Sequence, residues 1–263
     1  MEVIICPDAR RVGEVGGAKV AGLARQAGPS VVLGAATGSS PLGTYATLAG
    51  LVLRGELDLS GASVFALDEY VGLPPDHPES YHAVIDRTVT VPLGLDPARV
   101  HVPDGARAGL STAGVRYEDT IKAAGGVDVQ ILGIGSNGHI GFNEPASSLA
   151  SRTRVKTLTE QTRLDNRRFF ASLDEVPVRC VTQGLGTILD ARHAVLVASG
   201  AGKAEAVAAM VEGPVTAMCP ASVLQLHQHA TVIVDEDAAS LLRHADYYRS
   251  VQATLLNEQG AGY

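Results

Sequence analysis

The sequence lacks tryptophan altogether and contains little cysteine, the residue that cross-links secreted proteins and binds structural metals. Its three cysteines, Cys6, Cys180 and Cys219, are odd in number, far apart and without Cys-x-x-Cys spacing. This pattern favours reduced thiols in a core over disulfide bonds or a zinc site. We assign these thiols no role.

Clusters of basic residues and long apolar segments are also missing. Lys and Arg number 21 against 28 Asp and Glu, the net charge is -7, and no run is rich in Lys or Arg. No stretch approaches the roughly 18 uncharged apolar residues of a membrane span, and the first residues, with an acid at position 2, do not resemble a targeting segment. We therefore expect a cytoplasmic protein with neither nucleic acid nor membrane as a partner.

What the sequence does contain is a regular alternation of apolar runs and stretches with helical spacing. Strand-like runs lie at 3–6, 31–34, 64–67, 127–133, 194–198 and 231–234, and helical spacing lies at 10–26, 112–124, 159–170, 203–211 and 238–256. This rhythm predicts an α/β fold with a mostly parallel sheet and helices on both faces. Because no repeat or low-complexity linker interrupts the 263 residues, we expect a single domain over residues 1–263.

A glycine-rich loop after the fourth apolar run holds the most informative residues. Residues 133–145 read GIGSNGHIGFNEP, which places His139 and Glu144 among glycines. In open α/β folds, ligands bind where such loops leave the carboxyl ends of parallel strands. Histidine carries protons in both directions near neutral pH, and a nearby carboxylate fixes its tautomer. The competing interpretation, a structural histidine, is disfavoured by the density of glycine.

A second loop of small residues, GAATGSSP at 34–41, joins an apolar run to a helix that we expect to open at Pro41. Its hydroxyls and free N–H groups suit a phosphate at the positive end of the helix dipole. The candidate phosphate ligands there are Thr37, Gly38, Ser39 and Ser40. Since the loop is neither a Walker A loop nor a G-x-G-x-x-G turn, ATP and NAD are disfavoured. An ordinary tight turn is the alternative.

Two adjacent acids, Asp68 and Glu69, follow the third apolar run. A carboxylate among apolar neighbours can have its pKa raised enough to act as a base on a weakly acidic C–H. The alternative is an acid that caps a helix near Ser80. The residues alone leave the choice between the two acids open.

Other polar residues supply candidate ligands. Arg168 and Lys203 are candidates for holding a phosphate, the first as a planar fork and the second as a point charge. Two pairs of histidines lack either the spacing or the further ligands of a metal site, and we predict no metal. These pairs are His77 with His82 and His227 with His229.

Together these segments resemble the glucosamine-6-phosphate deaminase family. The resemblance rests on LGAATGSSPLGTY at 33–45, LDEYVGLP at 67–74, HPESY at 77–81, the histidine loop, SSLASRTR at 147–154 and LQLH at 224–227. It implies a Rossmann-like sheet with lid elements over the cleft, no cofactor, and a homo-oligomer, for which a hexamer is the largest common form. It also implies isomerisation and deamination of D-glucosamine 6-phosphate to D-fructose 6-phosphate and ammonia, a step of amino-sugar catabolism.

The resemblance implies a role for each candidate residue. Asp68 matches the base that moves the C2 proton towards C1, and His139 matches the group that opens the sugar ring, with Glu144 beside it. The loop at 37–40, Arg168 and Lys203 match the phosphate site. Asn137 departs from the best-known members, which have Asp there. Asn can orient an imidazole but cannot neutralise its proton, so His139 depends on Glu144 and an altered pH profile is expected.

Two other functions and one regulatory role complete the expectations. A 6-phosphogluconolactonase-like hydrolase shares the fold, but its relatives lack the Asn143-Glu-Pro145 ending. A sugar-phosphate sensor of a transcription regulator would need a DNA-binding segment and a more basic charge. The resemblance also makes N-acetylglucosamine 6-phosphate a candidate effector, at positions matching Ser147, Arg154 and Lys156.

Overall fold

The centre of the molecule is a seven-stranded parallel sheet with the order β1-β10-β9-β6-β2-β3-β5. The computed structural model of this protein describes residues 1–260, with side chains through Thr254. The strands are β1 (Glu2–Cys6), β2 (Val32–Ala35), β3 (Ser63–Ala66), β5 (Val100–His101), β6 (Val129–Leu132), β9 (His193–Ala198) and β10 (Ala230–Asp235). All six predicted strands are present, and each is mostly apolar because both faces of the sheet are covered. The short edge strand β5 was not predicted.

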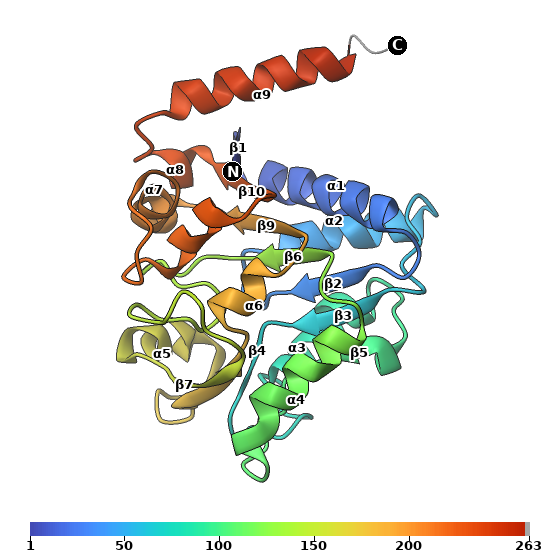
Figure 1. The fold of residues 1–263 in the computed structure, drawn as a ribbon, viewed down its shortest axis with the longest axis vertical. Coiled ribbons are helices and arrows are strands. Elements are labelled where there is room, and N and C mark those ends of the chain that lie inside the picture. The colour runs from blue at the N-terminus through green and yellow to red at the C-terminus, as the bar shows by residue number, and fades with distance from the viewer. Residues whose placement is uncertain (261–263) are drawn as a thin grey trace.

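Helices cover both faces of this sheet (Figure 1). One face carries α1 (Ala9–Ala27), α2 (Leu42–Leu53), α3 (Tyr81–Ile85) and the π-helical turn η1 (Asp86–Thr90). The other face carries α4 (Leu110–Ala123), α6 (Leu185–Leu189), α7 (Ala204–Glu212), α8 (Glu236–Ala239) and the 3-10 segment η5 (Pro220–Leu226). α1 begins where Asp8 accepts the N–H of Arg11 at 2.8 Å and ends at Gly28, whose φ is 91°. Within residues 1–260, no helix combines the length and apolarity needed to span a bilayer.

The prediction of one continuous helix at 238–256 was wrong, because the chain forms two helices there, α8 and α9 (Ala245–Gly260). The break has a clear cause. Glu212, at the end of α7, accepts the N–H groups of Arg243 and His244, both at 2.9 Å. These bonds use N–H groups that a continuous helix would need for itself. α9 therefore starts in a new direction and lies beside β1 (Figure 1).

A small antiparallel sheet with the order β4-β8-β7 lies beside the main one. Its strands are β4 (Asp68–Tyr70), β8 (Arg179–Thr182) and β7 (Arg154–Thr157), and none was predicted. Between β7 and β8 the chain forms α5 (Glu160–Asn166) and the 3-10 turn η3 (Arg167–Phe169), at the position of the predicted helix at 159–170. Further 3-10 turns are η2 (Pro97–Arg99) and η4 (Ala201–Lys203).

The order of the main sheet reverses between β2 and β6. From β2 the chain steps to β3 and β5 towards one edge, and from β6 it steps to β9 and β10 towards the other. Loops that leave the carboxyl ends of two such strands diverge and form a crevice in which ligands bind. The loops meet closely at their base, since a Cβ placed on Gly133 would lie 3.3 Å from Cβ of Ser40.

Candidate active site

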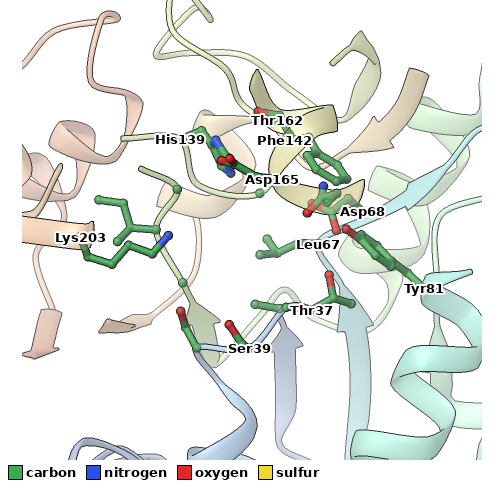
Figure 2. Close-up of a pocket in the computed structure, with 18 of the residues that line it drawn as sticks. Thr37, Ser39, Leu67, Asp68, Tyr81, His139, Phe142, Thr162, Asp165 and Lys203 are labelled. Carbon is green, nitrogen blue, oxygen red and sulfur yellow. The ribbon is translucent and has the colours of Figure 1, made fainter. Parts of the chain in front are cut away.

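A cleft opens at this reversal point, where segments following four adjacent strands meet α5 and η3 (Figure 2). Eight of the residues predicted for catalysis or phosphate binding line it: Thr37, Gly38, Ser39, Ser40, Asp68, His139, Arg168 and Lys203. Asn137 contacts the imidazole of His139 directly, and Glu144 is linked to it through Asn137. The three candidate effector residues do not line the cleft.

The loop after β2 presents backbone N–H groups at one end of the cleft. Gly38 has a φ of 86°, a conformation that favours glycine. Within residues 1–260, the N–H groups of Gly38, Ser39 and Ser40 donate to no protein acceptor, and α2 starts at once without a side-chain cap. Such an uncapped helix start binds anions readily.

Lys203 adds a cation to the cleft wall, and its ammonium points into the cleft (Figure 2). Burial lowers the pKa of Lys203, the charge of Asp165 opposes this effect, and Arg168 adds to it. An incoming phosphate dianion would favour the charged ammonium, so ligand binding and protonation of Lys203 support one another. Arg168 stacks on Phe169, with its guanidinium carbon 4.8 Å from the ring centroid.

The two adjacent acids have different surroundings because successive side chains of β4 point to opposite sides. Asp68 lines the cleft and is 4 % exposed, and burial, then the charge of Glu69, raises its pKa well above the ordinary value. Glu69 turns away and accepts N–H groups at the start of α3. Glu69 thus takes the alternative role of an acid at the start of the helix after Ser80, and Asp68 remains the candidate base.

His139 is held by a chain of side-chain hydrogen bonds. Asn137 donates from Nδ2 to Oε2 of Glu144 at 2.9 Å, and its Oδ1 lies 2.7 Å from Nδ1 of His139. An ionised carboxylate only accepts, so the amide oxygen must face the ring, Nδ1 carries the hydrogen and Nε2 is free to accept a proton. Glu144 is fixed in turn by the N–H of Thr159 at 3.3 Å and its hydroxyl at 3.2 Å.

The surroundings of His139 favour the neutral imidazole. Burial lowers its pKa, the charges of Glu144 and Asp165 oppose this effect, and Lys203 adds to it. Oε2 of Glu144 lies 3.7 Å from Nδ1, behind the Asn137 amide. Gly135 is required by the ring position, because a Cβ there would lie 2.2 Å from Cε1 of His139.

Sequence reasoning missed several lining residues. Tyr81, Phe142, Thr162 and Asp165 also face the cleft. Asp165 accepts a hydrogen bond from Oγ of Ser136 at 3.3 Å and lies three residues before Arg168 in sequence. That helical spacing was the available signal, together with the place of Tyr81 in the HPESY segment.

Two of the candidate effector residues, Arg154 and Lys156, lie on β7. Ser147 is buried, and within the described side chains its hydroxyl has no partner. Arg154 donates from Nη1 to Oδ1 of the buried Asn143 at 2.8 Å, which ties β7 to the histidine loop. Lys156 is partly buried on the same strand.

Curated relatives are similar to this chain over almost their whole length. A glucosamine-6-phosphate deaminase of Bifidobacterium longum strain DJO10A is 60% identical over 257 residues, which cover 94% of this chain and 95% of the relative. A glucosamine-6-phosphate deaminase of Streptomyces coelicolor is 56% identical over 261 residues, which cover 99% of this chain and 100% of the relative.

Solved structures agree with the fold. A monomeric glucosamine-6-phosphate deaminase superposes with a TM-score of 0.89 at 41% identity and covers 92% of this chain and 100% of its own. A 6-phosphogluconolactonase from Trypanosoma cruzi, at 19% identity and a TM-score of 0.72, shares the fold over 92% of this chain and 97% of its own. Residues 17–233 match the family model of glucosamine-6-phosphate isomerases and 6-phosphogluconolactonase, and the chain therefore belongs to that family.

Proposed function

We propose that this protein is a glucosamine-6-phosphate deaminase, which converts D-glucosamine 6-phosphate and water to D-fructose 6-phosphate and ammonia. The observation that carries the proposal is a buried carboxylate with a raised pKa, Asp68, in the same cleft as an imidazole whose Nε2 is free, His139. An aldose must open its ring before its carbonyl can acidify C2, so the reaction needs a two-way proton carrier and a separate base.

Each group has one step. His139 takes the O1 proton through Nε2 and returns a proton to the ring oxygen, which opens the hemiacetal. Asp68 then removes the C2 proton, which the new aldehyde has acidified, and delivers a proton to C1. The resulting imine at C2 is hydrolysed by water, and ammonia leaves while the ketose remains. The raised pKa of Asp68 suits the first half of its step, because a stronger base accepts the C2 proton more readily.

The substrate phosphate binds at the other end of the cleft. The N–H groups of Gly38, Ser39 and Ser40, with Lys203 and Arg168, hold an anion away from the reacting carbons. Binding energy from this remote group fixes C1 and C2 relative to Asp68 and His139. No metal or cofactor enters any step of this proposal.

Regulation and assembly are finer parts of the proposal. N-acetylglucosamine 6-phosphate binds at Ser147, Arg154 and Lys156 in a cytoplasmic homo-oligomer. The buried hydroxyl of Ser147, which has no partner among the side chains that the structure describes, supports such a site. The link from Arg154 to Asn143 supports its coupling to the histidine loop. Light scattering with and without the effector measures the mass in solution, and a mass that stays at 27.2 kDa in both contradicts the oligomer.

Ammonia release from glucosamine 6-phosphate, with fructose 6-phosphate measured in parallel, tests the proposed activity. Equal concentrations of glucosamine and of 6-phosphogluconolactone serve as comparison substrates. We expect ammonia and ketose in equal amounts from the first substrate alone. Lactone hydrolysis without ammonia release would identify a hydrolase, and tight sugar-phosphate binding without turnover of either substrate would identify a sensor.

A further inference from the structure

Glu69 is a buried acid that the proposed reaction does not use. It is 5 % exposed and lies on β4 directly after Asp68, with its side chain on the opposite side of the strand. Its Oε1 accepts the N–H groups of Tyr70 at 2.7 Å and Tyr81 at 3.0 Å, and its Oε2 accepts the N–H of His82 at 2.9 Å. A carboxylate that is removed from water and bonded to three N–H groups is an exacting arrangement, because each lost contact leaves a buried polar group unpaired.

Two of the three contacts connect β4 to the first turn of α3, and the third lies within β4. Ser80 already caps this short helix, since its Oγ accepts the N–H of Ala83 at 3.1 Å and donates to the carbonyl of Pro75 at 2.7 Å. Glu69 takes two of the N–H groups that remain free at the helix start. Its charge also lies at the positive end of α3, where an anion is favoured. One side chain therefore ties the start of α3 to β4, the strand that carries Asp68.

Tyr81 is the residue that this connection places in the cleft. Its ring forms part of the wall beside Asp68, and its hydroxyl end points towards that acid (Figure 2). Phe142, from the histidine loop, stacks on the ring of Tyr81 with centroids 5.8 Å apart and an angle of 13° between the ring planes. The hydroxyl of Tyr81 lies 3.4 Å from the hydroxyl of Tyr70. The wall therefore joins β4, α3 and the histidine loop around the base.

We propose that Glu69 is a positioning residue for the proposed reaction: it holds Tyr81 as the cleft wall beside Asp68 and places a second negative charge next to the base. The inference rests on the proposed deaminase function and adds a role for a residue that touches no substrate. The chain thus uses its two adjacent acids as a base and as the support of that base.

The charge of Glu69 acts on Asp68 in a defined direction. After burial, it is the second cause that raises the pKa of Asp68. The other titratable groups around the pair are Tyr70, Tyr81, Tyr117 and Cys180, all with pKa values raised by burial, and His82, which faces Glu69. The tyrosines and the thiol stay neutral near neutral pH. Burial also raises the pKa of Glu69, and its contacts with three N–H groups oppose that effect. Over the pH range in which Glu69 is ionised, removing its charge lowers the pKa of Asp68.

Two conservative variants separate the charge from the positioning. Glu69→Gln removes the charge and keeps the length, so its one oxygen can still accept the N–H groups of Tyr70 and Tyr81, while the N–H of His82 loses its acceptor. We expect the acidic limb of kcat/KM for glucosamine 6-phosphate to move to lower pH by on the order of one unit, with a lower plateau from the weaker base. Glu69→Asp keeps the charge but is one methylene too short to bond both β4 and α3. We expect its acidic limb to stay in place while kcat/KM falls by on the order of 10²-fold.

Asp76→Asn is the matched control, because it removes an exposed carboxylate from the loop that precedes α3. We expect its profile to follow the native protein. Profiles of both Glu69 variants that equal the native one, or that change identically, would overturn the proposal. If neither variant folds, Tyr81→Ala keeps the backbone N–H that Glu69 binds and removes the cleft wall, and an unchanged kcat/KM in that variant overturns it as well. A native protein that releases no ammonia instead contradicts the proposed function itself.

Discussion

The carboxamide oxygen of Asn137 lies 2.7 Å from Nδ1 of His139, and this contact fixes the tautomer of the imidazole. The amide nitrogen of Asn137 donates to Glu144. Because a carboxylate only accepts, Glu144 fixes the orientation of the Asn137 amide, and the amide fixes the orientation of the His139 ring. The arrangement orients the ring without placing a full charge against it. Proton affinity at His139 is therefore set by burial and by charges further away.

We predict that Asn137→Asp raises the pKa of His139. An ionised carboxylate beside Nδ1 favours the imidazolium, typically by about 1–3 units for a close opposite charge. The ring then becomes protonated at a higher pH than in the native protein, and the corresponding loss of activity on acidification moves to higher pH. An NMR titration of the imidazole Cε1–H measures the shift directly.

Asp165→Asn is the opposing control for this titration. The charge of Asp165 raises the pKa of His139, so its removal must lower that value. Because Asp165 is exposed, the change should be a few tenths of a unit and should vanish in about 1 M salt, where charges are screened over about 3 Å. If both variants shifted the pKa of His139 in the same direction, the result would contradict this account of the site.

Gly135→Ala should lower activity strongly while the protein still folds. The added Cβ would lie 2.2 Å from Cε1 of His139, so the ring must move. A displacement of about 1 Å in a reacting group costs on the order of 10²-fold in rate. Gly22→Ala is the control, since a Cβ there meets nothing within 4 Å. Steady-state kinetics with circular dichroism tests this, and native kcat in Gly135→Ala would show that the ring position is not critical.

Lys203→Ala and Arg168→Ala should each weaken phosphorylated ligands selectively. A charge-assisted contact is worth about 1.5–3 kcal/mol, or roughly ten- to a hundred-and-fifty-fold in affinity. Calorimetry compares glucosamine 6-phosphate with glucosamine, and Lys122→Ala on α4, outside the cleft lining, is the control. Equal losses for both ligands would assign these cations to the fold instead of to the phosphate.

Arg154→Ala should lower the stability of the protein whether or not an effector binds. Its Nη1 satisfies Oδ1 of Asn143, a fully buried side chain, and an unpaired buried acceptor costs about 1–3 kcal/mol. Lys156→Ala, on the same strand, lacks this contact and should leave the free energy of unfolding unchanged. Urea denaturation distinguishes the two. Native stability in Arg154→Ala would show that the contact with Asn143 does not stabilise the fold.

The sheet and the cleft could be predicted from the sequence because their signals are local. Buried parallel strands read as continuous apolar runs, and the glycine-rich loops that follow β2 and β6 mark the carboxyl edge. The three-residue strand β4 could not be predicted, since it begins with two acids and exists only through its pairing with β8. The same pairing decides which of those acids faces the cleft. The break between α8 and α9 depends on Glu212, which is distant in sequence.

The partners of the candidate residues were also beyond sequence reasoning. The amide of Asn137 proved to bridge Glu144 and His139, which spacing within one loop does not reveal. Asp165 has only its helical spacing from Arg168 to distinguish it in the sequence, yet α5 places it in the cleft lining. Such contacts arise from the tertiary packing of separate segments.

The fate of the C2 proton tests the central claim most directly. In deuterated water, glucosamine 6-phosphate should yield fructose 6-phosphate that carries deuterium at C1, because a base shared with solvent moves the proton from C2. Asp68→Asn should bind the substrate normally, lose on the order of 10²–10⁴ in kcat and show no exchange at C2. Near-native turnover in Asp68→Asn, with deuterium still appearing at C1, would contradict the assignment of Asp68 as the base.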